Sequence, residues 1–293
     1  MTEWTSQLHK WIRLCCVAEV SAAKPGNVSF SQCFIDVAAE DFLRSADAIA
    51  PVISQVNKCG IGETIFLAVQ ATQAAVHSNT NLGIVLLLTP MVAVSASHSL
   101  ADGIEDVLRT LTVDDAVWVY KAIGLAAPGG LGKSASQDVF DVPTMDLRAC
   151  MQLAADRDLI AAQYTNGFVD VLQTGCRLLQ QSGDWRKLAD FRLAWLALNL
   201  MAEFGDSLIQ RKCGDEMNRL VSTKARHVLE CGWPFTAGTQ AIYDEFDSFL
   251  RADGNRRNPG TTADMIAAIL FASLREGICT YDESGNTLMF SAD

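Results

Sequence analysis

The sequence has little of several features that would point to particular classes of protein. Positive charge is scarce: 23 Lys and Arg residues stand against 34 Asp and Glu residues, for a formal net charge of −11. We therefore expect no nucleic-acid partner, and any polyanion must meet a local cluster of cations or backbone N–H groups. The nine cysteines contain no Cys-x-x-Cys pair, which favours reduced, packed thiols over a disulfide framework or a zinc site.

A run long enough to span a membrane is also missing. The longest apolar stretch, residues 82–96 (LGIVLLLTPMVAVSA), is interrupted by Thr89 and Pro90 and is shorter than the ~20 residues that a membrane helix needs. The first ten residues, MTEWTSQLHK, have an early Glu and no apolar stretch after a basic one, unlike an export signal. We expect a helix buried inside the protein at 82–96, no membrane partner and a cytoplasmic location.

Helical periodicity is abundant. Apolar residues recur largely at intervals of three and four in 146–182 and in 184–212, where Asp184 can cap the second helix. The segment 261–275 (TTADMIAAILFASLR) follows Pro-Gly, opens with Thr caps and then runs apolar. The best candidate for a strand, VWVY at 117–120, fits a helix as well. The sequence predicts one all-α domain over residues 1–293, with 276–293 as a peripheral tail.

Short polar loops break the helices at 24–27 (KPGN), 79–81 (NTN), 127–134 (APGGLGKS) and 251–260 (RADGNRRNPG). The third loop ends in Gly132-Lys133-Ser134 like a phosphate-binding P-loop, but Ala127 stands in the place of the first glycine. The ASQDVFDVP that follows has no helical period, whereas a P-loop opens a helix. We favour a glycine-rich loop whose amides face phosphate.

Three carboxylates stand in apolar surroundings. Asp206 lies in LMAEFGDSLIQRKCG, Asp264 in NPGTTADMIAAILF and Glu63 in CGIGETIFL. An ionised carboxylate near an apolar core is costly unless it is paired or meets a metal. Two interpretations stay open on the sequence alone: internal salt bridges, for example between Asp206 and Arg256 or Arg257, or a functional site.

Five fragments, in order over about residues 19–272, resemble motifs of the triphosphoribosyl-dephospho-coenzyme A synthase family. Glu19 with residues 24–28 resembles its early Lys-Pro-Gly-x-Val element, and residues 41–46 resemble Asp-Phe-x-x-Phe-x-x-Ser-Ala. Glu63 falls where the family has a glutamate ahead of Asn-Thr-His-Lys-Gly, a motif that residues 79–83 occupy. Residues 200–211 resemble Leu-Met-x-x-x-x-Asp-Thr-Asn followed by His-Arg, and residues 258–264 resemble Ser-Pro-Gly-Gly-Ser-Ala-Asp.

The chain departs from these motifs at several positions. The family's His and Lys are replaced by Asn81 and Leu82, its Thr-Asn by Ser207 and Leu208, and the later His by Gln210. Two potential cations and several hydrogen-bonding groups are therefore missing. We infer a divergent member of the family whose phosphate or acceptor site has changed.

The resemblance implies a transferase in which the 2′-hydroxyl of dephospho-coenzyme A attacks C1′ of the ATP ribose and adenine leaves. Such a displacement needs a carboxylate to take the hydroxyl proton and negative charge near an oxocarbenium-like ribose. The triphosphate calls for Mg²⁺ and for cations or amides.

The residues that would serve this chemistry are far apart in sequence, and we expect them around one central nucleotide pocket. The predicted catalytic and Mg²⁺-binding carboxylates are Glu63, Asp206 and Asp264, and which of them is the base stays open. The predicted nucleotide- and phosphate-binding residues are Lys24, Gly26, Asn27, Asn79, Thr80, Asn81, Lys133, Arg211, Asn258 and Gly260.

Two alternative functions accompany this prediction. The missing His and Lys favour the same ATP-ribosyl chemistry on another acceptor of a cofactor pathway. A non-catalytic nucleotide-binding protein on the same scaffold is the other alternative. The sequence does not give the oligomeric state.

Overall fold

The computed structural model describes residues 2–30, 32, 38–129, 137–181, 191–282 and 288–290. These residues form fourteen α-helices and one two-stranded β-hairpin, and helix takes up 69% of the chain. The predicted all-α class is therefore confirmed.

The first six helices are α1 (Glu3–Ser21), α2 (Ala39–Ile53), α3 (Ile61–Val76), α4 (Leu82–Ala93), α5 (Leu100–Arg109) and α6 (Val113–Ala126). The others are α7 (Leu147–Gln152), α8 (Leu159–Asn166), α9 (Cys176–Gln180), α10 (Arg192–Phe204), α11 (Ser207–Cys213), α12 (Asp215–Glu230), α13 (Gln240–Arg251) and α14 (Gly260–Arg275). A 3₁₀ turn covers Val56–Lys58 and a π-helical turn covers Asp170–Gly175. The strands are β1 (Cys279–Tyr281) and β2 (Leu288–Phe290).

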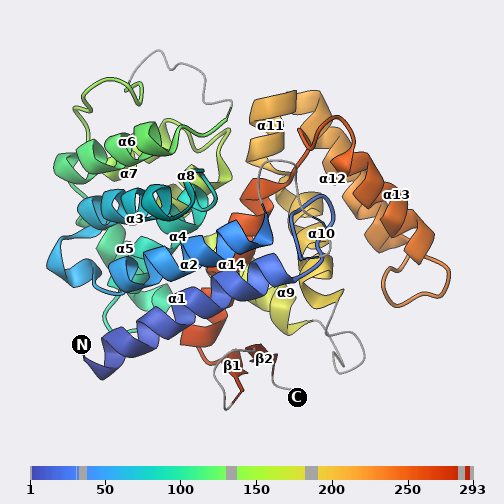
Figure 1. Cartoon of the computed structure of the whole chain (residues 1–293), viewed down its shortest axis with the longest axis horizontal. Coiled ribbons are helices and arrows are strands. Elements are labelled where there is room, and N and C mark those ends of the chain that lie inside the picture. The colour runs from blue at the N-terminus through green and yellow to red at the C-terminus, as the bar shows by residue number, and fades with distance from the viewer. Residues whose placement is uncertain are drawn as a thin grey trace.

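Two helices form the centre of the molecule. In α4 every residue from Gly83 to Val92 is buried, and in α14 every residue from Met265 to Leu274 is buried. A helix that is apolar on all sides is stable only when other elements surround it. Helix α14 meets this condition, because it runs between the group that contains α1 to α6 and the group that contains α10 to α13 (Figure 1). The helix expected at 82–96 is confirmed in α4, and no helix within the described ranges is long and apolar enough to cross a membrane.

The helices differ from the sequence prediction mainly at their ends. Residues 146–182 form several short helices, because α8 ends at Gly167, whose φ of +71° belongs to the left-handed region. Residues 191–213 form α10 and α11, which are separated at Gly205 with a φ of +70°. The candidate strand at 117–120 lies inside α6, and Asp184 lies outside the described residues.

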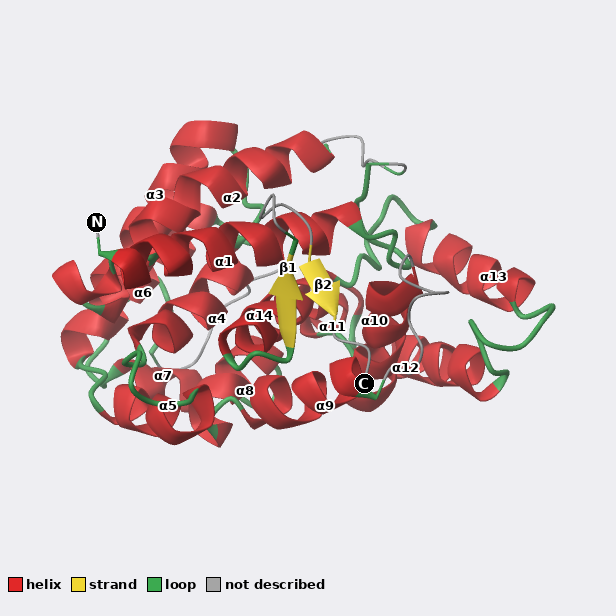
Figure 2. Ribbon diagram, turned by 90° about the horizontal axis from the view of Figure 1, so that it is seen from below, coloured by secondary structure: helices red, strands yellow, loops and turns green. Residues whose placement is uncertain are grey.

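Part of the segment expected as a peripheral tail packs against the body of the protein. Strands β1 and β2 pair antiparallel, with Cys279 opposite Phe290 (Figure 2). Cys279 is buried and clusters with Leu14 of α1 and Leu274 of α14. The hairpin therefore covers one end of the central helix.

Candidate functional site

A cavity of about 1030 Å³ lies where the N-terminal ends of α4, α8, α11 and α14 meet. This volume is at the upper end of the range of roughly 300–1,000 Å³ that is usual for small-molecule sites. The first backbone N–H groups of a helix lack partners within the helix, and the helix dipole makes this end positive. The cavity is therefore suited to a large ligand that carries negative charge.

The loop before α4, residues 79–81, is held in place by hydrogen bonds of its polar side chains. Asn79 Oδ1 accepts a hydrogen bond from the Leu82 N–H at 3.2 Å. The hydroxyl of Thr80 shares a hydrogen bond with the hydroxyl of Ser45 in α2. Asn79 therefore satisfies the first N–H of α4, whose N-cap residue is Asn81, and Thr80 fixes the loop to α2, although Asn79 and Thr80 also line the cavity.

Asn81 is the loop residue with capacity left for a ligand. Its side chain is 5% exposed and lines the cavity. Its Oδ1 lies 3.0 Å from the hydroxyl of Thr72, which donates to it, whereas its Nδ2 has no partner among the described residues. Because an unpartnered buried donor is costly, this amide is a candidate contact for a ligand.

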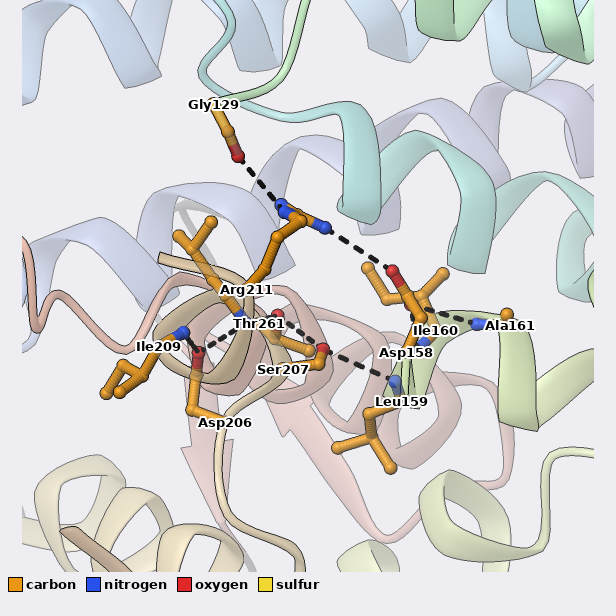
Figure 3. Close-up of polar contacts among 11 residues, drawn as sticks. Gly129, Asp158, Leu159, Ile160, Ala161, Asp206, Ser207, Ile209, Arg211 and Thr261 are labelled. Atoms are coloured by element: carbon orange, nitrogen blue, oxygen red, sulfur yellow. Dashed lines mark hydrogen bonds and ion pairs between the residues drawn. The ribbon is translucent and has the colours of Figure 1, made fainter. Parts of the chain in front are cut away.

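Asp206 joins the N-termini of two helices. Its Oδ1 accepts from the backbone N–H groups of Leu208 and Ile209 at the start of α11 (Figure 3). Its Oδ2 accepts from both the N–H and the hydroxyl of Thr262 in α14. Burial raises the pKa of this carboxyl, against the effect of these four hydrogen bonds.

This arrangement bears on three expectations. Asp206 forms no salt bridge with Arg256 or Arg257 among the described residues. It does not line the cavity and both of its oxygens are engaged, and its catalytic and metal-binding roles stay predictions. The residue at the N-cap of α14 is Pro259, and Thr262 donates to Asp206 instead of capping its own helix.

Ser207 fixes the start of a third helix, α8, to the starts of α11 and α14. Its hydroxyl lies 3.0 Å from the hydroxyl of Thr261 in α14 and accepts from the N–H of Leu159 at the start of α8, at 3.3 Å (Figure 3). The N-terminal ends of α8, α11 and α14 are thus fixed to one another by short side chains.

Two cations of α11 face the cavity. Arg211 donates from Nε to the carbonyl oxygen of Gly129 at 3.0 Å, and its Nη1 lies 3.5 Å from Asp158 Oδ2 (Figure 3). The other oxygen of Asp158 caps α8 by accepting from the N–H groups of Ile160 and Ala161. Burial, and then the charge of Arg211, lower the pKa of the neighbouring Lys212, which also lines the cavity.

Asp264 is a carboxylate without a partner. It lines the cavity, and in the described part of the chain no hydrogen bond or ion pair engages it. Burial, together with the negative charges of Glu19, Asp206 and Asp158, raises its pKa well above the ordinary value. It packs so closely on α4 that a Cβ at Gly83 would lie 2.1 Å from Asp264 Oδ2.

Glu19 and Lys24 form a buried ion pair. Lys24 is 1% exposed and Glu19 is 4% exposed, and Lys24 Nζ lies 3.0 Å from Glu19 Oε1. The same ammonium donates to the backbone carbonyls of Glu19 and Ala22. Glu19 lines the cavity but Lys24 does not, so the structure does not place Lys24 where we expected it, and its contact with phosphate stays a prediction.

The structure brings together only part of the predicted site. The predicted residues that line the cavity are Asn27, Asn79, Thr80, Asn81, Arg211, Asn258, Gly260 and Asp264. Asn258 Oδ1, like Asn81 Nδ2, is buried without a partner among the residues described. The predicted residues that do not line it are Lys24, Gly26, Glu63 and Asp206.

Glu63 and Gly26 lie away from the cavity, in segments that are held by contacts with other helices. Glu63 lies in the first turn of α3, where the preceding Gly62 donates its N–H to Asp115 of α6. Gly26 adopts a φ of +74° and donates its N–H to Asp247 of α13. Lys133 lies outside the described residues, so its predicted contact with phosphate stays a prediction.

The predicted set missed seven charged residues that line the cavity: Glu19, Asp138, Asp156, Arg157, Asp158, Lys212 and Asp215. A signal for Asp158 was available, because Asp directly before the apolar LIAA is typical of a helix N-cap. Glu19 was a further acidic residue in an apolar helical stretch, CCVAEV. Lys212 had no signal beyond its position next to Arg211.

Comparisons with known proteins found a family model and a solved structure that match this chain. Residues 5–280 match the model of a family described as ATP:dephospho-CoA triphosphoribosyl transferase. A crystal structure from Archaeoglobus fulgidus, provisionally described as a triphosphoribosyl-dephospho-CoA synthase, is 27% identical, covers 81% of this chain and 98% of its own, and superposes with a TM-score of 0.63. No curated protein matches the sequence. The family match extends over nearly the whole chain, and the protein therefore belongs to the ATP:dephospho-CoA triphosphoribosyl transferase family.

Proposed function

We propose that the cavity binds ATP and dephospho-coenzyme A together and transfers the triphosphoribosyl group from one to the other. The family supplies the reaction: an acceptor hydroxyl attacks C1′ of the ATP ribose, the C1′–N9 bond breaks, and adenine leaves. The observation that carries the proposal is the cavity itself, whose lining combines helix N-termini and cations with a set of apolar side chains.

The cations and helix N-termini in the lining suit the triphosphate. Arg211 and Lys212 supply positive charge, and the starts of α4 and α14 supply N–H groups. The unpartnered amide of Asn81 adds a hydrogen-bonding group. Guanidinium and backbone N–H groups are effective partners of phosphate oxygens because the hydrogen bonds are charge-assisted.

Asp264 fits the magnesium ion that accompanies ATP. Its carboxylate is unpartnered in the described structure and stands in the negative field of Glu19, Asp206 and Asp158, which a divalent cation would relieve. No ready-made group of three or more His, Cys, Asp or Glu side chains appears among the described residues. This agrees with the usual mode of Mg²⁺, which takes one or two carboxylates plus substrate phosphates. Bound there, the ion would neutralise charge on the triphosphate.

The apolar part of the lining suits a purine base or the pantetheine arm of the acceptor. Helices α6 and α7 contribute Val119, Tyr120, Ile123, Leu147, Cys150 and Met151 to it. The hydroxyl of Tyr120 donates to the carbonyl oxygen of Gln137 at 2.7 Å, which fixes the ring in the wall. Apolar and aromatic side chains with a few placed polar groups are the usual lining of such sites.

A second candidate keeps this chemistry and changes the acceptor. Leu82 lines the cavity at the position where the family motif has a lysine, so an acceptor phosphate would find an apolar group there. The cytoplasmic location predicted from the sequence accompanies either candidate, since both use ATP, and it stays a prediction.

Adenine release tests the proposal. The protein is incubated with ATP, Mg²⁺ and either dephospho-coenzyme A, coenzyme A or no acceptor, and free adenine is measured by chromatography. We expect adenine with dephospho-coenzyme A and none without an acceptor. Adenine with a different acceptor would support the second candidate, and ATP binding without adenine release on any acceptor would indicate a non-catalytic protein.

A further inference from the structure

Six acidic side chains line the cavity, and they differ in whether hydrogen bonds or ion pairs occupy their carboxylate oxygens. They are Glu19, Asp138, Asp156, Asp158, Asp215 and Asp264. Asp156 and Asp215 are exposed to solvent and bind Arg157 and Gln210, respectively. Both oxygens of Asp158 are engaged, one by the start of α8 and the other by Arg211.

Two of the remaining carboxylates keep an oxygen for a substrate: Glu19, which is buried, and Asp264, which is half-buried. Asp138, by contrast, is in a surface loop and accepts from the N–H of Phe140. Asp264 has no partner within the described ranges, and the proposed function assigns it to the metal-bound triphosphate. Glu19 uses Oε1 for Lys24, and its Oε2 engages no group in the part of the chain that the structure describes.

Glu19 has the properties of a proton acceptor. Lys24 supplies the opposite charge, which offsets the cost of burying a carboxylate that is only 4% exposed. The ammonium is itself fixed by the carbonyl oxygens of Glu19 and Ala22, which holds the side chain of Glu19 in one orientation. A buried, oriented carboxylate with one open oxygen in a substrate cavity meets the geometric requirement for a general base.

We propose that Glu19 is the general base of the transfer reaction and that Lys24 is its positioning residue; this inference rests on the proposed function. The acceptor O–H bond breaks and its proton goes to Glu19 Oε2, while the oxygen forms a bond to C1′ of the ATP ribose. The C1′–N9 bond breaks, and adenine leaves with its electron pair and takes up one proton from solvent. Glu19 later returns its proton to solvent, so charges and protons balance.

Glu19→Gln tests the role of the carboxylate with little change of shape. We expect kcat for adenine release to fall by about 10²- to 10⁴-fold, the usual contribution of a general base, while the Kd for Mg·ATP stays within about threefold. Glu3→Gln is the matched control, because Glu3 is exposed in the first turn of the same helix, α1, and does not line the cavity; the kcat of this variant should equal that of the unmodified protein. Unchanged kcat in Glu19→Gln, or lost ATP affinity with kcat retained, would overturn the proposal.

A double variant covers the case in which Glu19→Gln does not fold, since it leaves the buried charge of Lys24 unpaired. Replacing both members of a buried ion pair is often tolerated where replacing one is not, so Glu19→Gln with Lys24→Met should recover the melting temperature. We expect adenine release to stay lost in this variant. If activity returns with the fold, Glu19 only balances Lys24 and the inference is wrong. If the unmodified protein releases no adenine with any acceptor, the proposed function fails independently of Glu19.

Discussion

At the scale of single residues, Asp264 is the site residue whose proposed role depends most on its surroundings. Its position four residues after Gly260 was recognisable in the sequence, because an Asp within an apolar helix has few inexpensive environments. Its surroundings were not recognisable, because Glu19, Asp206 and Asp158 come from three other parts of the chain. The field of these carboxylates depends on the packing of α1, α8 and α11 around α14, which local sequence does not encode.

Asp264→Asn should separate these two contributions. At a pH near the ordinary Asp value of about 4, the raised pKa keeps the carboxyl of the folded protein protonated, so Asn replaces it with little change and we expect the free energy of unfolding to change by only about 1 kcal/mol. Turnover with Mg·ATP should fall by roughly 10²-fold, the scale on which a preorganised electrostatic contact acts. Thermal melts and adenine release on the same preparation check both expectations. A lower melting temperature with unchanged Mg·ATP affinity would mean that Asp264 only holds the helix.

The raised pKa of Asp264 also predicts a pH dependence of stability. The folded state binds this proton more tightly than the unfolded state, so the contribution of Asp264 is fully present below its unfolded pKa and is lost as pH rises through the folded pKa. Asp264→Asn does not titrate, and the variant should gain stability relative to the unmodified protein as pH rises from about 4 towards neutrality. Urea unfolding at several pH values, without Mg·ATP, measures this difference. A difference that does not vary with pH would contradict the raised pKa.

At the scale of elements, sequence periodicity located the helices better than it located their ends. Helices α4 and α14 were predicted because their residues are apolar on every side. The separation of α10 from α11 was missed, because it depends on Gly205 in a left-handed conformation and on Asp206 accepting from two helices at once. The contact of Asp206 with Thr262 in α14 is a tertiary contact, and the local sequence pattern does not predict it.

Asp206→Ala should therefore cost more than the loss of an ordinary helix cap. It removes the acceptor of three backbone N–H groups and one hydroxyl, and we expect a loss of about 2–4 kcal/mol in the free energy of unfolding. Asp146→Ala is the matched control, because Asp146 caps α7 by a single hydrogen bond to Ala149 and should cost about 1 kcal/mol. Urea unfolding measures both, and equal losses would contradict the proposed link between α11 and α14.

The close approach of α4 and α14 makes a separate prediction. A methyl group at Gly83 would lie 2.1 Å from Asp264 Oδ2 and 2.5 Å from Ile160 Cδ1, so Gly83→Ala should destabilise the protein by about 1–3 kcal/mol and weaken Mg·ATP binding. Gly124→Ala in α6 is the control, because a Cβ there meets nothing within 4 Å and a helical glycine replaced by alanine is neutral or stabilising by up to about 1 kcal/mol. Melting temperatures should fall for the first variant alone.

At the scale of the whole molecule, the site exists only where distant segments meet. The cavity takes residues from α1, α4, α8, α11 and α14, and these helices come from both halves of the chain (Figure 1). The sequence fragments that resembled the family placed eight predicted residues on the cavity, whereas Glu63 and Lys24 lie off it. Family motifs thus identified the chemistry, and the packing of the helices decided which side chains reach it.

The central claim is that the whole triphosphoribosyl group moves to an acceptor inside this cavity. The most direct test is the mass spectrum of the products formed from dephospho-coenzyme A, Mg²⁺ and ATP that is isotopically labelled in its ribose. Our account predicts an acceptor that gains the labelled ribose with all three phosphates, together with unlabelled adenine in equal amount. An acceptor of unchanged mass, or an acceptor that gains phosphate without the ribose label, would contradict it.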